Sequence, residues 1–192
     1  MAILVIIGFA AGFGPSEYLR VKNKAKLSAM AELAGVCAYE NKDVSTALEN
    51  LYVAIFLNPS NGGAHLGLGY LFYDQGLYDL SLHEFEKYLQ NPKSGVLTAF
   101  SDKEDKKWEK FAKHDIAWTY CYIGDIYEKK GDKENSSKNY RKAAESDPDF
   151  TKFLETYIKF INEKKEKRER DFKKLELLNK TLSRIRAEQR RT

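Results

Sequence analysis

The feature that most constrains this 192-residue sequence is a spacing of glycines, aromatic residues and prolines that recurs along the chain. Gly69 and Gly124 are each followed three positions later by an aromatic residue, Phe72 or Tyr127, and Gly35 lies 34 residues before Gly69. Sequence repeats of roughly 20–50 residues indicate stacked units, because one unit cannot bury its apolar face alone. The spacing therefore predicts three similar units, which end near Pro59, Pro92 and Pro148.

Within each unit the apolar positions have helical spacing, and a second small residue follows the glycine at Ala47, Ser81 or Ser136. Small residues allow two helices to approach closely, and a proline ends the second helix because it cannot continue it. The pattern resembles the tetratricopeptide consensus W-x2-L-G-x2-Y, A-x3-F and Pro over roughly residues 28–148. This resemblance implies an all-α fold, a right-handed solenoid of three helix pairs with a capping helix and a long C-terminal helix.

We expect four parts along the chain. They are an apolar N-terminal arm at 1–15, a repeat domain at 16–148 with an insertion at 93–113, a capping helix at 149–161 and a charged basic C-terminal helix at 162–192. The insertion contains Ser101-x-x-Glu104, a capping box that predicts the start of an extended helix. The first repeat lacks the aromatic residues of the consensus and is the weakest part of the resemblance.

Residues 1–13 are continuously apolar, but a helix needs about 20 such residues to span a bilayer. Four cations follow this run, and we take them as candidates for binding lipid headgroups: Arg20, Lys22, Lys24 and Lys26. If residues 1–19 contact a membrane, the positive-inside rule places the body on the cytoplasmic side. The alternative is a cytoplasmic protein whose arm is buried in a partner or under the first repeat.

In tetratricopeptide domains the first helix of each pair lines a concave groove, and the resemblance carries these positions onto this chain. The first repeat supplies Glu32, Val36, Tyr39 and Glu40; the second supplies Leu66, Tyr70, Tyr73 and Asp74; the third supplies Trp118, Cys121, Asp125 and Glu128. The Lys, Asn and Arg residues with which some relatives clamp a carboxylate are missing at the matching positions. We therefore expect the groove to bind an apolar or basic protein segment, with Tyr and Trp as anchors.

Two further sets of residues are candidates for docking other proteins: Trp108 and Phe111 in the insertion, and Leu175, Leu178, Leu182 and Ile185 near the C-terminus. The aromatic pair either packs in the core or forms an exposed ridge. The four aliphatic residues fill only two heptads, too few for an autonomous coiled coil. We expect residues 172–188 to lean on another helix of an assembly, or else to be a solvated tail.

The sequence offers no catalytic or metal-binding motif. Its three histidines are scattered, Cys37 and Cys121 have no partner at ligand spacing, and we predict no enzyme activity, cofactor or metal. Residues 162–192 hold twelve Lys or Arg and six Asp or Glu, but lack aromatics after Phe172 for base stacking, which disfavours nucleic acid as a partner. The predicted function is a non-catalytic protein-interaction scaffold of a membrane-associated complex. The alternative is a soluble peptide-binding adaptor or assembly chaperone.

Overall fold

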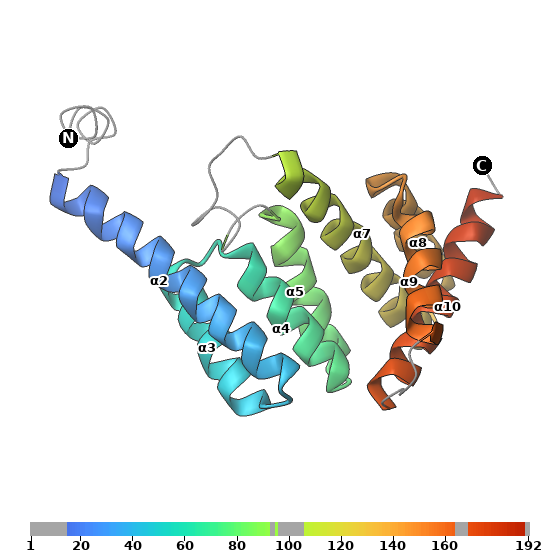
Figure 1. Cartoon of the computed structure of the whole chain (residues 1–192), viewed down its shortest axis with the longest axis horizontal. Helices are drawn as coiled ribbons and strands as arrows, with labels where there is room; N and C mark the ends of the chain where they lie inside the picture. Colours follow the sequence, from blue (N-terminus) through green and yellow to red (C-terminus); the bar gives the residue numbers. More distant parts are fainter. Residues whose placement is uncertain (1–14, 93–94, 96–105, 164–168, 191–192) are drawn as a thin grey trace. The chain divides into compact units, whose positions relative to one another are not determined.

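The structure, a computed structural model, describes residues 15–92, 95, 106–163 and 169–190. Every regular element of these residues is an α-helix, which confirms the predicted all-α class of paired helices (Figure 1). The chain divides into two compact units, Met1–Asp105 and Lys106–Thr192, and each has its own apolar core. The boundary between the two units falls inside the insertion predicted at 93–113.

Unit 1 consists of two helix pairs. The helices α2 (Pro15–Glu40) and α3 (Val44–Leu57) form the first pair, and α4 (Gly62–Asp74) and α5 (Tyr78–Gln90) form the second. The second pair packs on the first mainly through α3 and α4, and the core between them is made of small and aliphatic side chains with one aromatic ring: Ala38, Ala47, Leu51, Ala54, Ala64, Leu68, Leu71 and Phe72. The helix α2 is almost twice as long as α3.

Unit 2 begins with a third helix pair, α7 (Lys106–Lys129) and α8 (Lys133–Ser146). The capping helix expected at 149–161 corresponds to α9 (Phe150–Glu163), which begins two residues after Pro148. The C-terminal helix α10 (Glu169–Gln189) packs against both α8 and α9. The predicted helix start at Ser101 lies outside the described residues.

The same close contact holds each of the three pairs together. A Cβ atom added at Gly35 would lie 2.7 Å from Leu51 Cγ, and one at Gly124 would lie 3.2 Å from Tyr140 Cδ2. At Gly69 the added atom would overlap the ring of Phe85, and the Ser81 hydroxyl donates a hydrogen bond of 2.8 Å to the Gly69 carbonyl oxygen. Glycine is therefore required at Gly35 and Gly69 and favoured at Gly124, because a large side chain of the second helix fills the space that a Cβ would take.

Side-chain caps define where several of these helices begin. Asp43 accepts a hydrogen bond from the Thr46 amide at the start of α3, and Asn61 accepts one from Ala64 at the start of α4. Asp132 caps α8 in the same way through the Asn135 amide. Because the first amides of a helix have no partner inside the helix, these caps fix the register at which each helix leaves its turn.

The turns within the three pairs share one left-handed backbone position. Gly76 has φ +73° and Gly131 has φ +80°, and the matching residue of the first pair is Lys42 with φ +63°. An added Cβ at Gly76 or Gly131 meets nothing within 4 Å, so these glycines are required by the backbone conformation and not by space. Lys42 therefore adopts a conformation that is unfavourable for residues with a side chain.

We predict that Lys42→Gly raises the free energy of unfolding by about 0.5 kcal/mol, because the relief of left-handed strain exceeds the entropy that glycine adds to the unfolded chain. Gly76→Ala, the matched control, should lower it by about 1 kcal/mol. Urea denaturation followed by circular dichroism measures both changes. A Lys42→Gly protein less stable than the wild type would contradict the assignment of strain to this turn.

Candidate functional site

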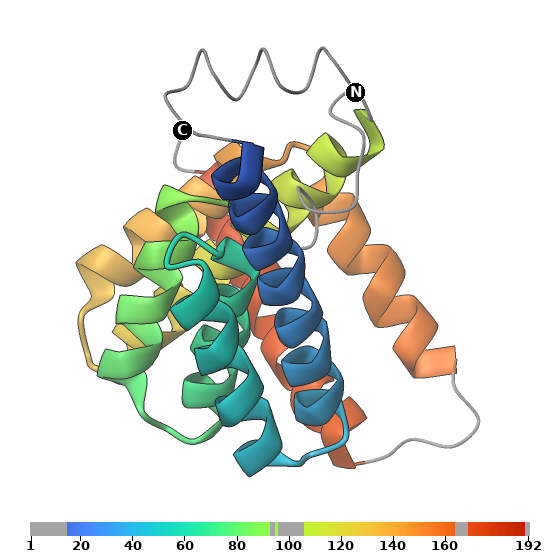
Figure 2. The same cartoon turned by 90° about the vertical axis from the view of Figure 1, so that its left-hand side faces the viewer.

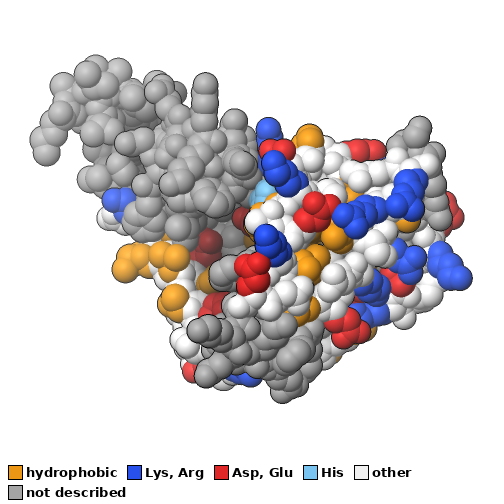
Figure 3. All heavy atoms as spheres, turned by 45° about the vertical axis from the view of Figure 1, so that its right-hand side comes forward, with side chains coloured by type: hydrophobic (Ala, Val, Ile, Leu, Met, Phe, Trp, Pro, Cys, Tyr) orange, Lys and Arg blue, Asp and Glu red, His pale blue; other side chains and the backbone are white. Residues whose placement is uncertain are grey.

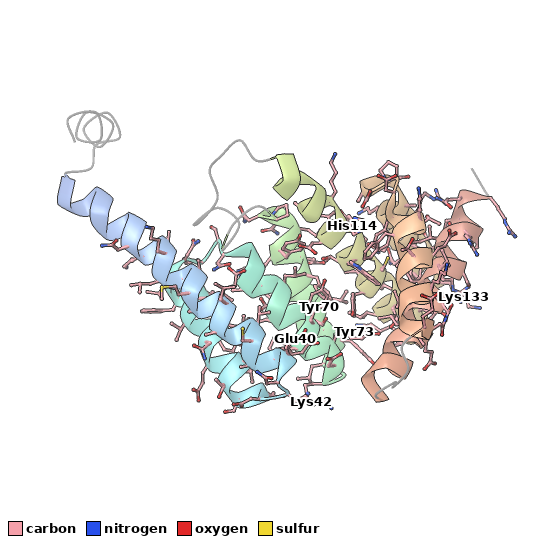
Figure 4. All side chains as sticks on the ribbon, in the orientation of Figure 1. Glu40, Lys42, Tyr70, Tyr73, His114 and Lys133 are labelled. Atoms are coloured by element: carbon pink, nitrogen blue, oxygen red, sulfur yellow. The ribbon has the colours of Figure 1, made fainter. Side chains whose placement is uncertain are left out.

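The surface shared by α2 and α4 carries most of the groove positions predicted for the first two repeats, and we call it the α2–α4 face. Its two helices are tied together where they end, because the Tyr39 hydroxyl donates a hydrogen bond of 2.6 Å to Asp74 Oδ2. Figure 4 labels Tyr70 and Tyr73 on α4, and Glu40 where α2 ends. The structure thus brings Tyr39, Tyr70, Tyr73, Glu40 and Asp74 onto one pair of neighbouring helices.

The tyrosines of this face are held by aromatic neighbours. The Tyr70 ring meets the Phe85 ring edge-on, with centroids 5.4 Å apart, and the Tyr73 ring lies 6.0 Å from that of Tyr78. Tyr70 and Tyr73 are half-buried, as is Leu66 one turn earlier on α4. Each ring therefore has a fixed orientation and an accessible part, and rings of this kind contribute contact area at little cost in conformational entropy.

An apolar residue that the sequence analysis missed is exposed on α2 near the predicted groove position Val36. Leu33 is exposed one turn before Val36, and Val36 is exposed one turn before Glu40. In the repeat register Leu33 matches Gly67, which is buried against Leu51 of the preceding pair, so Leu33 belongs to the outer side of α2. Val36 matches Tyr70 and adds an exposed apolar residue to the α2–α4 face.

The charge on the α2–α4 face is negative. Glu40 and Asp74 are both exposed, and they lie where α2 and α4 end. Carboxylates near the C-terminal end of a helix add to the negative end of the helix dipole, which favours a cationic partner. The face therefore combines apolar and aromatic contact area with an acidic edge.

Glu32, predicted to line the groove, is instead buried inside unit 1. A Cβ atom at either Gly63 or Gly95 would overlap its carboxylate, so the carboxylate lies against the backbone of both glycines. Gly63 belongs to the first turn of α4, where a negative charge is favourable. Glu32 therefore stabilises the packing of α4 on α2, and a partner cannot reach it.

In the third repeat, the chain's own C-terminal helix covers the predicted groove positions. The buried Asp125 carboxylate accepts hydrogen bonds from Lys129 and from Lys180 of α10, the latter at 2.5 Å. Glu128 pairs with Arg184 of α10 at 2.7 Å. Basic and acidic side chains are interspersed on the side of unit 2 that Figure 3 turns forward. The residues predicted to bind another protein are occupied within the chain, which corrects that part of the predicted groove.

The apolar side of α10 explains why this helix packs there. Leu178 and Ile185 are fully buried and Leu175 and Leu182 nearly so, in a core that also contains Cys121 and Tyr140. We expected these four residues to lean on another helix of an assembly, but they pack against α8 and α9 of the same chain. Trp118 is half-buried, and its ring meets that of Phe150 edge-on at 5.3 Å. The side chains of Trp108 and Phe111 lie outside the described part of the structure.

The ionisable groups of this core are held in their neutral forms. Burial raises the pKa of the Cys121 thiol well above its usual value, so the thiolate required of a nucleophile is disfavoured. Burial also raises the pKa of the Tyr140 hydroxyl, and the nearby Asp125 carboxylate adds to this effect. Both side chains therefore act as packing residues.

Each of the two described histidine–carboxylate pairs links helices within its own unit. His65 bonds to Glu84 at 2.6 Å through Nδ1 and to the Pro59 carbonyl oxygen at 3.0 Å through Nε2. His114 pairs with Asp147 and packs edge-on against Phe153, so it links α7 to the start of α9. In the residues that the structure describes, no three His, Cys, Asp or Glu side chains are grouped to hold a metal ion.

The four candidate cations for lipid headgroups all lie on α2. Arg20 and Lys22 belong to its first turns, and Lys24 and Lys26 are exposed. None of the helices in the described ranges is both long and apolar enough to cross a membrane. The apolar run at 1–13 lies outside these ranges.

Comparison with known proteins supports the class that the fold defines. The model of the tetratricopeptide repeat family matches residues 119–150, the segment that contains Gly124, Tyr140 and Pro148. A search of the curated proteins found none that matches this chain. Residues 119–150 thus match a tetratricopeptide repeat, and the two helix pairs of unit 1 repeat the glycine contact of the matched pair. Repeats of this class generally bind protein segments, which supports a role as a scaffold.

We predict that Lys180→Met lowers the stability of unit 2 by about 1–2 kcal/mol, because the buried Asp125 carboxylate loses one of its two cations. Lys159→Met is the matched control: its pair with Glu163 spans 3.9 Å and both side chains are exposed, so no measurable change is expected. Chemical denaturation measures both. Equal stability of the two variants would show that α10 does not depend on this ion pair.

Proposed function

We propose that this protein is a non-catalytic scaffold that binds a basic, amphipathic segment of another protein on its α2–α4 face. We further propose that it works as a subunit or peripheral factor of a membrane-associated complex. The observation that carries the first proposal is the joint presence of accessible, oriented tyrosines and exposed carboxylates on neighbouring first helices. Tyrosines in such surroundings are common energetic anchors of interfaces.

The chain's own α10 supports the chemistry assigned to the partner. In the repeat register, Asp125 and Glu128 of the third repeat match Tyr70 and Tyr73 of the second. At the third repeat these positions are met by a helix that places Lys180 and Arg184 four residues apart on one side and Leu178 and Leu182 on another. A helix with basic and apolar residues at this spacing is therefore a segment that such a surface can hold.

The α2–α4 face differs from the third repeat in a way that favours a partner from another chain. Its tyrosines and Leu66 are half-buried and Glu40 and Asp74 are exposed, whereas Asp125 and Cys121 are fully covered. Exposed apolar and aromatic side chains beside charged ones mark surfaces that bind other proteins. The acidic edge then selects among partners by charge, since like charges repel and opposite charges speed association.

Support for the membrane-associated part comes from the sequence at the start of the chain. Residues 1–13 carry no charge, and four cations follow on α2. A polybasic segment is attracted to anionic lipid, and an apolar segment strengthens that binding. The second candidate function, a soluble peptide-binding adaptor or assembly chaperone, uses the same α2–α4 face without the membrane.

The tyrosine anchors can be tested by affinity purification in mild detergent followed by mass spectrometry. We predict that proteins recovered with the wild type fall about tenfold or more with the double variant Tyr70→Ala and Tyr73→Ala, because each ring is an anchor. Tyr52→Ala is the matched control, since Tyr52 is an exposed tyrosine on α3, the second helix of its pair. Recovery that is equal for all three proteins would overturn the assignment of the face.

The predicted charge preference has its own test on any partner so identified. Glu40→Lys should weaken binding and reduce its dependence on salt concentration, because it removes an attractive charge from the acidic edge. Isothermal titration at two salt concentrations measures both quantities. Tighter binding by Glu40→Lys would show that the partner segment is acidic.

Membrane fractionation of the full-length protein and of a variant that lacks residues 2–14 separates the two candidate functions. The membrane-associated scaffold requires that the full-length protein is found in the membrane fraction and that the truncation moves protein into the soluble fraction. A full-length protein that is already soluble favours the adaptor.

A further inference from the structure

An exposed apolar surface lies at the outer side of the first helix pair, and no part of the proposed scaffold site uses it. Leu27 and Met30 of α2 are 52% and 57% exposed, and Val53 and Phe56 of α3 are 49% and 85% exposed. The Ser28 hydroxyl donates a hydrogen bond of 2.7 Å to the Ala54 carbonyl oxygen, which places these two helix segments level with each other. We call the four residues the α2–α3 end face, and Figure 2 views the chain with α2 and α3 in front.

The repeat register shows what normally covers this surface of α2. Leu27 and Met30 match Asn61 and Ala64 of the second pair, counted from Gly35 and Gly69. Asn61 and Ala64 are fully buried, and Asn61 Nδ2 donates a hydrogen bond of 2.8 Å to the Ser28 hydroxyl of the preceding pair. On the first pair the same positions carry larger apolar side chains that are about half exposed. The face is thus built for contact with an apolar neighbour.

The α3 side of the face gives an internal comparison. Val53 and Phe56 match Lys87 and Gln90 of α5, and both of these polar residues are exposed. Where water is the neighbour, the second pair therefore uses polar side chains at these positions. A valine and a phenylalanine at the first pair indicate a neighbour other than water, because exposed apolar clusters are otherwise a liability.

The charge beside the α2–α3 end face favours an anionic lipid surface as its neighbour. Lys24 and Lys26 are exposed on α2 within one turn of Leu27, and the uncharged segment 1–13 joins the same helix at Pro15. Glu49, one acidic side chain on α3, lies about two turns before Phe56 and thus away from the lysines. Apolar side chains bordered by lysines fit the headgroup and acyl boundary of a bilayer, where the lysines meet phosphates and the apolar side chains enter the interface. Because a bilayer is fluid, the 85% exposed Phe56 side chain can enter it without a preformed pocket.

We propose that the α2–α3 end face is a peripheral membrane-binding surface for anionic lipid, in which Phe56, Met30, Leu27 and Val53 enter the interface and Lys24 and Lys26 bind headgroup phosphates. The proposal rests on the membrane-associated part of the proposed function. It adds a folded surface to the apolar arm and fixes which side of unit 1 faces the bilayer. The α2–α4 face, with Tyr70 and Tyr73 on α4, keeps its proposed role in binding protein.

The test measures binding of the full-length protein to vesicles of phosphatidylcholine, with and without phosphatidylglycerol. Wild-type protein should bind only the anionic vesicles, and Phe56→Asp should weaken this binding about tenfold because an apolar contact is replaced by a repelled charge. Leu80→Asp is the matched control, since Leu80 is 50% exposed on α5, and it should bind as the wild type does. The double variant Lys24→Gln and Lys26→Gln should bind more weakly and with less dependence on salt. Circular dichroism verifies that each variant is folded.

The failures of the two proposals are distinguishable. Anionic vesicle binding that is equal in wild type, Phe56→Asp and Leu80→Asp overturns the end face but leaves membrane association in place. Absence of vesicle binding by the wild type overturns both, and the pull-down on the α2–α4 face is unaffected. A wild-type dimer in light scattering that Phe56→Asp converts to a monomer would assign the face to a second copy of this chain, and so would also overturn the proposal.

Discussion

The close approach of two helices at a glycine is the contact on which the rest of this structure depends. Leu51, Phe85 and Tyr140 each fill the space beside a glycine of the partner helix, and all three side chains are buried. Since the glycine contact sets the distance and rotation between the helices of a pair, it also decides which side of the first helix faces outward. Tyr70 and Tyr73 are oriented by this arrangement, because Tyr70 packs on the same Phe85 ring that fills the space at Gly69.

The same position of the repeat has different uses in the two units. In unit 2, carboxylates at the groove positions bind cations of the chain's own α10, and the apolar side of that helix completes the core. In unit 1, the matching positions carry tyrosines that stay accessible beside Glu40 and Asp74. Unit 2 thus shows within one chain how this fold holds a basic amphipathic helix, and we propose that unit 1 offers a related surface to a helix from another chain. In the proposed scaffold, the third repeat stabilises the chain itself and the first two bind a partner.

Two surfaces of unit 1 then serve different neighbours in the proposed assembly. The α2–α4 face combines aromatic rings with negative charge, and the α2–α3 end face combines aliphatic and aromatic side chains with lysines. In this proposal, opposite charges at the two surfaces give each its own class of partner, a basic protein segment for the first and an anionic bilayer for the second. Because both surfaces include residues of α2, such an assembly would hold the bilayer and the protein partner in a fixed relation to each other.

The sequence by itself determined the helix pairs, since glycine, small residue and proline at fixed spacing satisfy local requirements: close approach, left-handed turns and helix ends. The positions of Tyr70, Tyr73 and Glu40 on first helices followed from the same register. Only the tertiary structure decided that Glu32 is buried, because its neighbours Gly63 and Gly95 lie far along the chain. The tertiary structure also decided that α10 covers the third repeat. The spacing of Leu178, Leu182 and Ile185 shows that this helix has an apolar side, but it does not show which surface that side packs against. Periodicity is a local property of a sequence, whereas the choice between a surface of the same chain and that of another depends on shape and charge that only folding brings together.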